Sequence, residues 1–321
     1  MIELRDIYAA RRRIRPLVER TPLEYSRSLS KITGTETYVK LEMMRETRAF
    51  KIRGAVNFLL AMSEAERSKG VMAASGGSHA MGVAFAANRL GVRSTIVMTE
   101  RSSENLRAMC REYGAEVIVQ GQVYNDSAQI AEAIAKERGM TLIHSYDDPL
   151  IVAGQGTIGL EIMEDLPDVE AVVAPVGGGG LLAGVGCALK SVRPGVEVIG
   201  VEPENANAMT LSLRENKLVT LENPRSLADR LVVKTPGELT LAMAKRYVDR
   251  LVNVTEEEIA THIVMLMEKV GVLAEGAAAT ASAALFSLKG DLRGRKVVLI
   301  LTGGNIAPSV LATVLAQAKL L

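Results

Sequence analysis

Short apolar runs alternate with longer amphipathic stretches through the middle of this chain. The apolar runs predict strands at 71–74, 94–98, 116–119 and 141–143, and the amphipathic stretches between them predict helices near 79–90, 102–113 and 125–138. A strand followed by a helix, repeated at this spacing, is typical of a parallel sheet covered by helices.

A second set of such elements flanks the first. It consists of strands at 37–41, 171–174, 196–201 and 296–301 and helices at 7–18, 51–60, 151–164 and 306–319. The pattern predicts an α/β fold with two doubly wound parallel-sheet domains, the smaller inserted in the larger. We expect residues 1–67 and 148–321 to form the large domain and residues 68–147 to form the small one.

The charge balance limits the classes of partner. The chain has 38 Lys and Arg against 37 Asp and Glu, so no basic field favours nucleic acid or an anionic membrane, and we expect a small-molecule ligand. Cys110 and Cys187 lie far apart, which argues against a disulfide framework and fits the cytoplasm. The uncharged run 171–189 contains Pro175 and several glycines, so we interpret it as buried core and not as a membrane span.

Four consecutive glycines, Gly177 to Gly180, join a predicted strand to the predicted helix that begins at Leu181. Without Cβ atoms the backbone can approach an anion closely, and the helix N-terminus adds a partial positive charge. The junction predicts a phosphate site, although a tight packing turn remains the alternative.

Other small-residue turns follow strands of the predicted sheets, where ligands bind in this fold class. The segment Ser75 to His79 follows one strand, and Thr302-Gly303-Gly304-Asn305 follows another. Lys51 stands after a loop, between the apolar Phe50 and Ile52. A lysine desolvated in this way has a lowered pKa and can form a Schiff base with a carbonyl.

The order of these motifs resembles that of the fold-type-II pyridoxal-phosphate enzymes, with the tryptophan synthase beta-like fold, and in particular the short threonine/serine dehydratases and serine racemases. The motifs, in chain order, are Arg20-Thr21-Pro22-Leu23, Lys40-Leu41-Glu42, Phe50 to Ala55, Ser75 to Ala80, Gly154-Gln155-Gly156-Thr157, Pro175 to Gly180 and Thr302 to Asn305. The resemblance covers nearly the whole chain.

The resemblance implies a role for each motif. Lys51 is similar to the Schiff-base lysine that later removes the substrate α-proton, and Thr302 to the residue that meets the pyridine nitrogen. The implied cofactor, pyridoxal 5'-phosphate, would be held by the residues Phe50, Ser78, Gly177, Gly178, Gly179, Gly180 and Leu181, and the substrate carboxylate by Ser75, Gly76, Gly77, Ser78 and His79. The large domain would bind the cofactor and the small domain the substrate.

The implied activity is α,β-elimination from a 3-hydroxy amino acid such as L-threonine or L-serine, giving a 2-oxo acid and ammonia. A hydroxyl partner leaves the pyridine nitrogen largely neutral, and the resulting weaker electron sink suits elimination. The family also implies a homodimer or homotetramer.

Several positions depart from the family pattern. Ser78 replaces the usual Asn, and Gly76 stands where racemases carry the serine that would reprotonate the second face. Glu202 and Ala206 match a divalent-cation site only in part. Arg48 is an addition, either a solvated loop arginine or a partner for a second substrate carboxylate, as in 3-hydroxyaspartate.

These departures leave alternatives within the family and outside it. Within it stand a 3-hydroxyaspartate dehydratase and a serine or aspartate racemase. Gly178 to Ala183 with Glu202 also fits the dinucleotide pattern of an NAD-dependent oxidoreductase, which does not explain Lys51 or Thr302. A non-catalytic relative that only binds the cofactor is a third class, suggested by Ala49 and Ser78.

Overall fold

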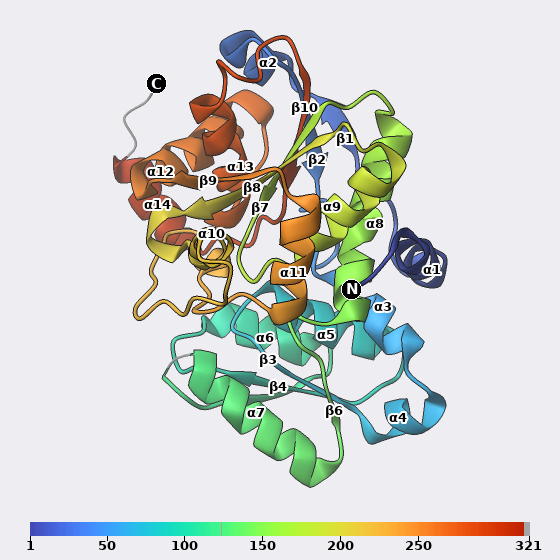
Figure 1. Cartoon of the computed structure of the whole chain (residues 1–321). Helices are drawn as coiled ribbons and strands as arrows, with labels where there is room; N and C mark the ends of the chain where they lie inside the picture. The colour runs from blue at the N-terminus through green and yellow to red at the C-terminus, as the bar shows by residue number, and fades with distance from the viewer. Residues whose placement is uncertain (123, 318–321) are drawn as a thin grey trace.

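Two sheets with helices on both faces make up the protein (Figure 1). The computed structural model describes residues 1–122 and 124–317. The large sheet has the order β1 (Leu23–Tyr25), β2 (Glu36–Leu41), β10 (Lys296–Leu301), β7 (Ala171–Pro175), β8 (Glu197–Pro203) and β9 (Arg250–Val254). The small sheet has the order β5 (Glu116–Val119), β4 (Ser94–Met98), β3 (Val71–Ala74) and β6 (Thr141–Leu142). All neighbours pair in parallel except β1 and β2.

The helices connect these strands in chain order. They are α1 (Leu4–Ile14), α2 (Arg27–Thr33), α3 (Ile52–Ala61), α4 (Glu64–Lys69), α5 (Ser78–Arg89), α6 (Glu104–Glu112), α7 (Tyr124–Arg138), α8 (Pro149–Asp165), α9 (Gly180–Val192), α10 (Ala208–Arg214), α11 (Glu238–Tyr247), α12 (Glu256–Met265), α13 (Gly276–Ser287) and α14 (Pro308–Gln317). Short 3-10 turns occur at η1 (Glu204–Ala206) and η2 (Asp229–Leu231), and a π-helical turn, η3 (Leu266–Val270), follows α12. No helix of the described ranges combines the length and apolarity needed to cross a bilayer.

The predicted α/β class with parallel sheets is confirmed. The chain leaves the large sheet after β2, builds the small sheet and returns to the large sheet at β7. The domain boundaries at 67/68 and 147/148 stay a prediction. The sequence did not predict β1 and β9, which form the two edges of the large sheet. The end of the predicted helix 306–319 lies outside the described residues.

Alternation along β10 shows how the large sheet is buried on both faces. Val297, Leu299 and Leu301 lie in one apolar cluster with residues of α12 and α13. Val298 and Ile300 lie in a second cluster with residues of α8 and α9. Successive strand residues point to opposite faces, so this strand needs apolar side chains throughout and has no polar face.

Close helix packing places α3 between the two sheets. A Cβ added at Gly154 of α8 would lie 2.6 Å from the Cα of Gly54 on α3, so glycine is required where these helices cross. The apolar face of α3 packs with β3 and β4 of the small sheet in a common cluster. The start of α3, where Lys51 stands, is therefore fixed against both halves of the molecule.

Candidate active site

Lys51 lies immediately before α3 in a largely buried environment. Its Nζ donates a hydrogen bond to the carbonyl of Ser145 at 2.8 Å and lies 5.2 Å from the centre of the Phe50 ring. Burial lowers the pKa of the Lys51 amine to about 8. A larger fraction of this amine is neutral at physiological pH than of an exposed lysine, and the neutral form is the nucleophile and the base.

Thr302 follows β10 and lies beside the segment that leads to Lys51. The N–H of Phe50 donates to the Thr302 carbonyl at 3.1 Å, and Ala49 forms an isolated antiparallel bridge with Gly303. The Thr302 Oγ1 is buried and has no hydrogen-bond partner. A buried hydroxyl without a partner is costly, so this atom is suited to a ligand that supplies one.

The glycine loop between β7 and α9 is shaped by Tyr146. A Cβ added at Gly178 would lie 2.2 Å from Cγ of that ring, and Gly179 adopts a left-handed conformation with φ of 93°. The Gly178 carbonyl accepts a hydrogen bond from Thr240 Oγ1 at 2.7 Å. Side chains would not fit here, and the loop leads directly into the N-terminus of α9, as a phosphate cradle requires.

The loop after β3 brings its polar groups to the start of α5. Gly77 donates its N–H to Ser75 Oγ at 3.1 Å, whereas Ser78 Oγ is buried without a partner. His79 Nε2 lies 3.1 Å from the Ile143 carbonyl, and its Nδ1 has no partner. Burial, and to a lesser degree the charge of Lys51, lowers the pKa of His79 to about 3, so the imidazole stays neutral.

Two charged residues of the site were not found from the sequence. Arg230 on η2 donates from Nη1 to the Gly76 carbonyl at 3.1 Å, and its Nε lies 3.8 Å from Glu275 Oε2. A Cβ added at Gly303 would lie 2.5 Å from Glu275 Oε1. These residues link the Ser75–His79 loop to the Thr302 segment, and they stand in stretches without a glycine motif that could have marked them.

The contacts therefore connect most of the sequence-predicted site residues. Lys51, Phe50 and Thr302 lie together. Lys51 also donates a hydrogen bond to Ser145, and the next residue in sequence, Tyr146, packs against the glycine loop. Arg230 adds the Ser75–His79 loop to the same set, and the next residue, Leu231, has its Cα 3.1 Å from where a Gly177 Cβ would stand.

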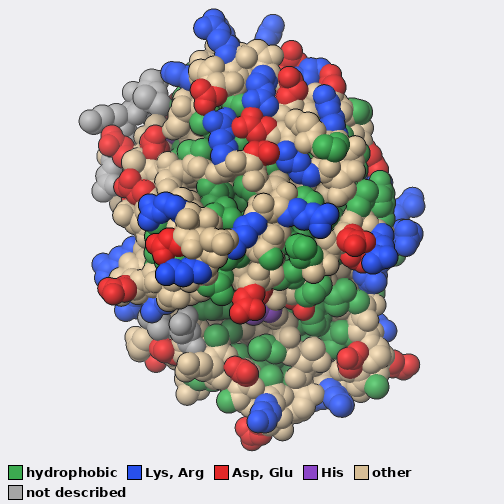
Figure 2. Space-filling view, in the orientation of Figure 1, with side chains coloured by type: hydrophobic (Ala, Val, Ile, Leu, Met, Phe, Trp, Pro, Cys, Tyr) green, Lys and Arg blue, Asp and Glu red, His purple; other side chains and the backbone are tan. Residues whose placement is uncertain are grey.

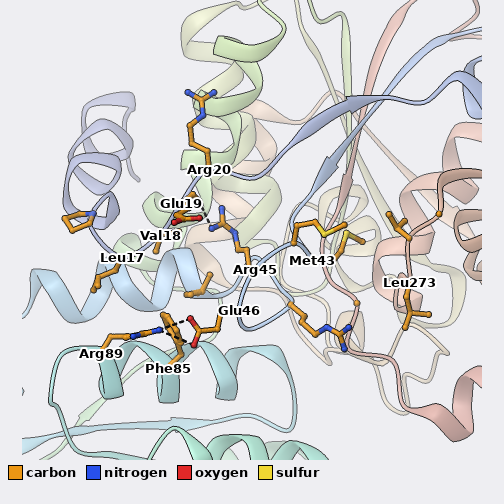
Figure 3. A pocket seen from close by; sticks show the side chains of 17 residues that line it. Leu17, Val18, Glu19, Arg20, Met43, Arg45, Glu46, Phe85, Arg89 and Leu273 are labelled. Carbon is orange, nitrogen blue, oxygen red and sulfur yellow. Dashed lines mark hydrogen bonds and ion pairs between the residues drawn. The ribbon is translucent and has the colours of Figure 1, made fainter.

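Arg48 contacts this set through its backbone, because its carbonyl accepts a hydrogen bond from the Gly304 N–H at 3.0 Å. Its side chain is exposed and lines a surface cavity of about 730 Å³ together with Arg20, Arg45 and Arg89 (Figure 3). In that cavity Arg89 is paired with Glu46 at 3.0 Å. The role of Arg48 in binding a substrate carboxylate stays a prediction.

The Glu202 carboxylate is hydrogen-bonded to the start of α10. It accepts hydrogen bonds from the N–H groups of Met209 and Thr210, at 2.9 Å and 2.7 Å, and from the Thr210 hydroxyl. Burial raises the pKa of Glu202 to about 7. No group of three or more His, Cys, Asp or Glu residues suited to a metal occurs within residues 1–122 and 124–317.

The arrangement defines an enzyme of the class that binds a phosphorylated aldehyde. A buried amine with a lowered pKa, a side-chain-free loop at a helix N-terminus and an unpartnered buried hydroxyl suit, respectively, the aldehyde, the phosphate and the ring nitrogen of pyridoxal phosphate. These residues fit the group that the sequence implied.

Comparison with known proteins agrees with this class. Residues 14–303 match the model of the family described as "Pyridoxal-phosphate dependent enzyme", and the chain belongs to that family. It is 48% identical over 95% of its length to the L-threonine ammonia-lyase of Thermotoga maritima, of which the match covers 76%.

The chain is also similar to solved structures of enzymes that, by their names, act on hydroxyamino acids. The processed form of threonine deaminase isoform 2 from Solanum lycopersicum has a TM-score of 0.94 at 35% identity, over 99% of this chain and 92% of that one. Maize serine racemase has a TM-score of 0.92 at 30% identity, over 98% and 97%.

Proposed function

We propose that this protein is a dehydratase that converts a 3-hydroxy amino acid to a 2-oxo acid and ammonia by α,β-elimination. The observation that carries the proposal is the meeting of Lys51 with the Thr302 segment and with Ser145, beside the glycine loop. The threonine ammonia-lyase name of a 48% identical relative supports the same reaction class.

Pyridoxal phosphate, when bound, supplies an electrophilic carbon for the substrate amine and an electron sink for the negative charge left at Cα. Lys51, held by the Ser145 carbonyl, takes the α-proton, because burial lowers the pKa of its amine to about 8 and so makes more of the neutral base available than an exposed lysine would. The start of α5, with Ser75 and Ser78, orients the substrate carboxylate. Thr302 Oγ1, buried and unpartnered, would hold the ring nitrogen as a neutral hydrogen-bond partner.

The glycine at position 76 favours elimination over racemisation. Racemisation needs an acid on the second face of the substrate, and glycine at this position offers none. Formation of D-serine from L-serine without ammonia release would favour the racemase alternative.

We also propose a cytoplasmic location and a homo-oligomeric assembly for the enzyme. The two buried free cysteines, Cys110 and Cys187, are consistent with the reducing cytoplasm, and the family resemblance favours a homodimer or homotetramer. Acidic and basic side chains are interspersed over the face in Figure 2, which supports a small amino-acid substrate over a polyanionic partner.

The test is a substrate screen on the protein loaded with pyridoxal phosphate. L-threonine and L-serine are each assayed for release of ammonia and of the 2-oxo acid, with Lys51→Ala as the inactive control. Turnover that Lys51→Ala abolishes supports the proposal. Cofactor binding with no ammonia from any 3-hydroxy amino acid contradicts it and favours a non-catalytic relative.

A further inference from the structure

The guanidinium of Arg230 lies directly beside the loop proposed to bind substrate. Its Nη1 donates to the Gly76 carbonyl at 3.1 Å, and a Cβ added at Gly77 would lie 2.9 Å from the same nitrogen. The side chain is only 22% exposed. An arginine on the large-sheet side is thus held against the small-sheet loop at the candidate active site.

The charges around Arg230 leave part of its binding capacity unused. Asp229, which is 64% exposed, lies 3.0 Å from Nη1, and Glu275 Oε2 lies 3.8 Å from Nε, beyond hydrogen-bond distance. The buried Nε has no hydrogen-bond partner. A guanidinium with an unsatisfied buried N–H is suited to a carboxylate, which it can bind through two parallel hydrogen bonds.

The orientation of Arg230 indicates which carboxylate it takes. The proposed function assigns the α-carboxylate of the substrate to the N-terminus of α5. Arg230 lies beside that N-terminus, at Gly76 and Gly77, and its Nε lies nearest to Glu275. Because the backbone N–H groups of α5 already serve the α-carboxylate in the proposed function, the unpartnered Nε of Arg230 is left for a second carboxylate of the same substrate.

We propose that Arg230 determines substrate specificity by binding the second carboxylate of an acidic 3-hydroxy amino acid, of which 3-hydroxyaspartate is the smallest. This inference rests on the proposed function. It assigns to Arg230 the role expected for Arg48, whose exposed side chain lines the surface cavity of Figure 3.

The reaction is the proposed elimination applied to a diacid. The Cα–H and C3–O bonds break, the α-proton and the 3-hydroxyl leave as one water, and the resulting imine takes up one water. The products are a 2-oxo dicarboxylic acid and ammonia, without any oxidant or reductant.

The test compares substrates on the loaded enzyme. Arg230→Ala is expected to lower kcat/KM for both substrates, because the hydrogen bond to Gly76 is lost, but to lower that for 3-hydroxyaspartate about 10- to 100-fold more than that for L-threonine. Arg230→Lys is expected to recover only part of the loss, because an ammonium lacks the planar fork. Arg225→Ala, an exposed arginine of the same segment, is the matched control and should leave both values unchanged.

Equal losses with both substrates would overturn the inference, since they would indicate a role in α-carboxylate binding or in folding. Failure of the unmodified enzyme to use 3-hydroxyaspartate while it uses L-threonine would also overturn it. A larger selective loss in Arg48→Ala than in Arg230→Ala would return the role to Arg48.

A binding measurement separates this inference from the proposed function. Titration calorimetry compares succinate with butyrate on unmodified protein and on Arg230→Ala. Tighter binding of succinate that disappears in the variant supports the inference even if no amino acid is turned over, in which case only the proposed function fails. Equal binding of the two acids, or succinate binding that Arg230→Ala leaves intact, overturns it.

Discussion

The Arg53 guanidinium and the buried Glu42 carboxylate are joined by two hydrogen bonds, Nε to Oε2 at 2.9 Å and Nη2 to Oε1 at 2.8 Å. Glu161 on α8 accepts two more from the same guanidinium, at 2.6 Å and 2.8 Å. Arg53 follows Lys51 by two residues. The network therefore fixes the first turn of α3 and, with it, Lys51, the lysine that we propose is catalytic.

Removal of the Arg53 charge should destabilise the protein strongly. We expect Arg53→Met to lower the free energy of unfolding by about 3–5 kcal/mol, because two buried carboxylates lose their shared guanidinium and keep one cation each, Arg45 for Glu42 and Lys40 for Glu161. Urea unfolding followed by circular dichroism measures the loss. Arg12→Ala, at an exposed position of α1, is the control and should change stability by less than about 0.5 kcal/mol. A loss no larger than that of the control would contradict the structural role.

The contact between Gly178 and Tyr146 predicts a collision when a side chain is added. Gly178→Ala places a Cβ inside the Tyr146 ring, so we expect a loss of about 1–3 kcal/mol in stability and weaker binding of pyridoxal phosphate. Tyr146→Ser in the Gly178→Ala background should restore part of the stability. Gly195→Ala, which meets nothing within 4 Å, is the matched control. Additive effects of the two substitutions would argue against the contact.

The lowered pKa of Lys51 predicts the pH dependence of cofactor loading. Only the neutral amine attacks an aldehyde, so the rate at which the apoprotein takes up pyridoxal phosphate should rise with pH through a midpoint near 8. The absorbance of the bound cofactor measures the rate of uptake, and Lys51→Arg should abolish this signal. A midpoint near 10.5, the ordinary pKa of lysine, would show that this amine is not desolvated.

The raised pKa of Glu275 predicts that the protein loses stability as the pH rises. Burial raises its pKa to about 7, so between pH 4.5 and 7 the folded protein holds a proton that the unfolded chain has released. Stability therefore falls with pH across this window. We expect Glu275→Gln to match the unmodified protein at pH 4 and to exceed it by about 2–3 kcal/mol at pH 8. Parallel unfolding profiles of the two proteins from pH 4 to 8 would contradict the assignment.

Local patterns predicted the central strands and the glycine motifs well. The run 296–301 is apolar at almost every position because both faces of β10 are buried, and the sequence shows this directly. The edge strand β9 mixes charged and apolar residues because one side lacks a partner strand, so no apolar run marked it.

The parts of the site that escaped prediction depend on long-range contacts. Arg230 lies 154 residues from Gly76 in sequence, and only the arrangement of the two sheets brings them within hydrogen-bond distance. Tyr146 likewise has no feature that marks it as a wall of the glycine loop until the chain is folded. Arg48 was expected in the site from its neighbourhood to Lys51. Its carbonyl accepts a hydrogen bond from Gly304 beside Thr302, its side chain is exposed, and its role toward substrate stays a prediction.

The bridge between Ala49 and Gly303 has a consequence for how the protein is made. The two residues that it joins, Ala49 and Gly303, are 254 positions apart, so the bridge cannot form before the chain has been synthesised through Gly303. Closing so long a loop is slow, and the partly made chain must keep its apolar helices from aggregating until then. The segment that leads to Lys51 consequently acquires its partners at Thr302 and Gly303 last, so we expect nascent chains that stop before these residues to lack the final surroundings of the lysine.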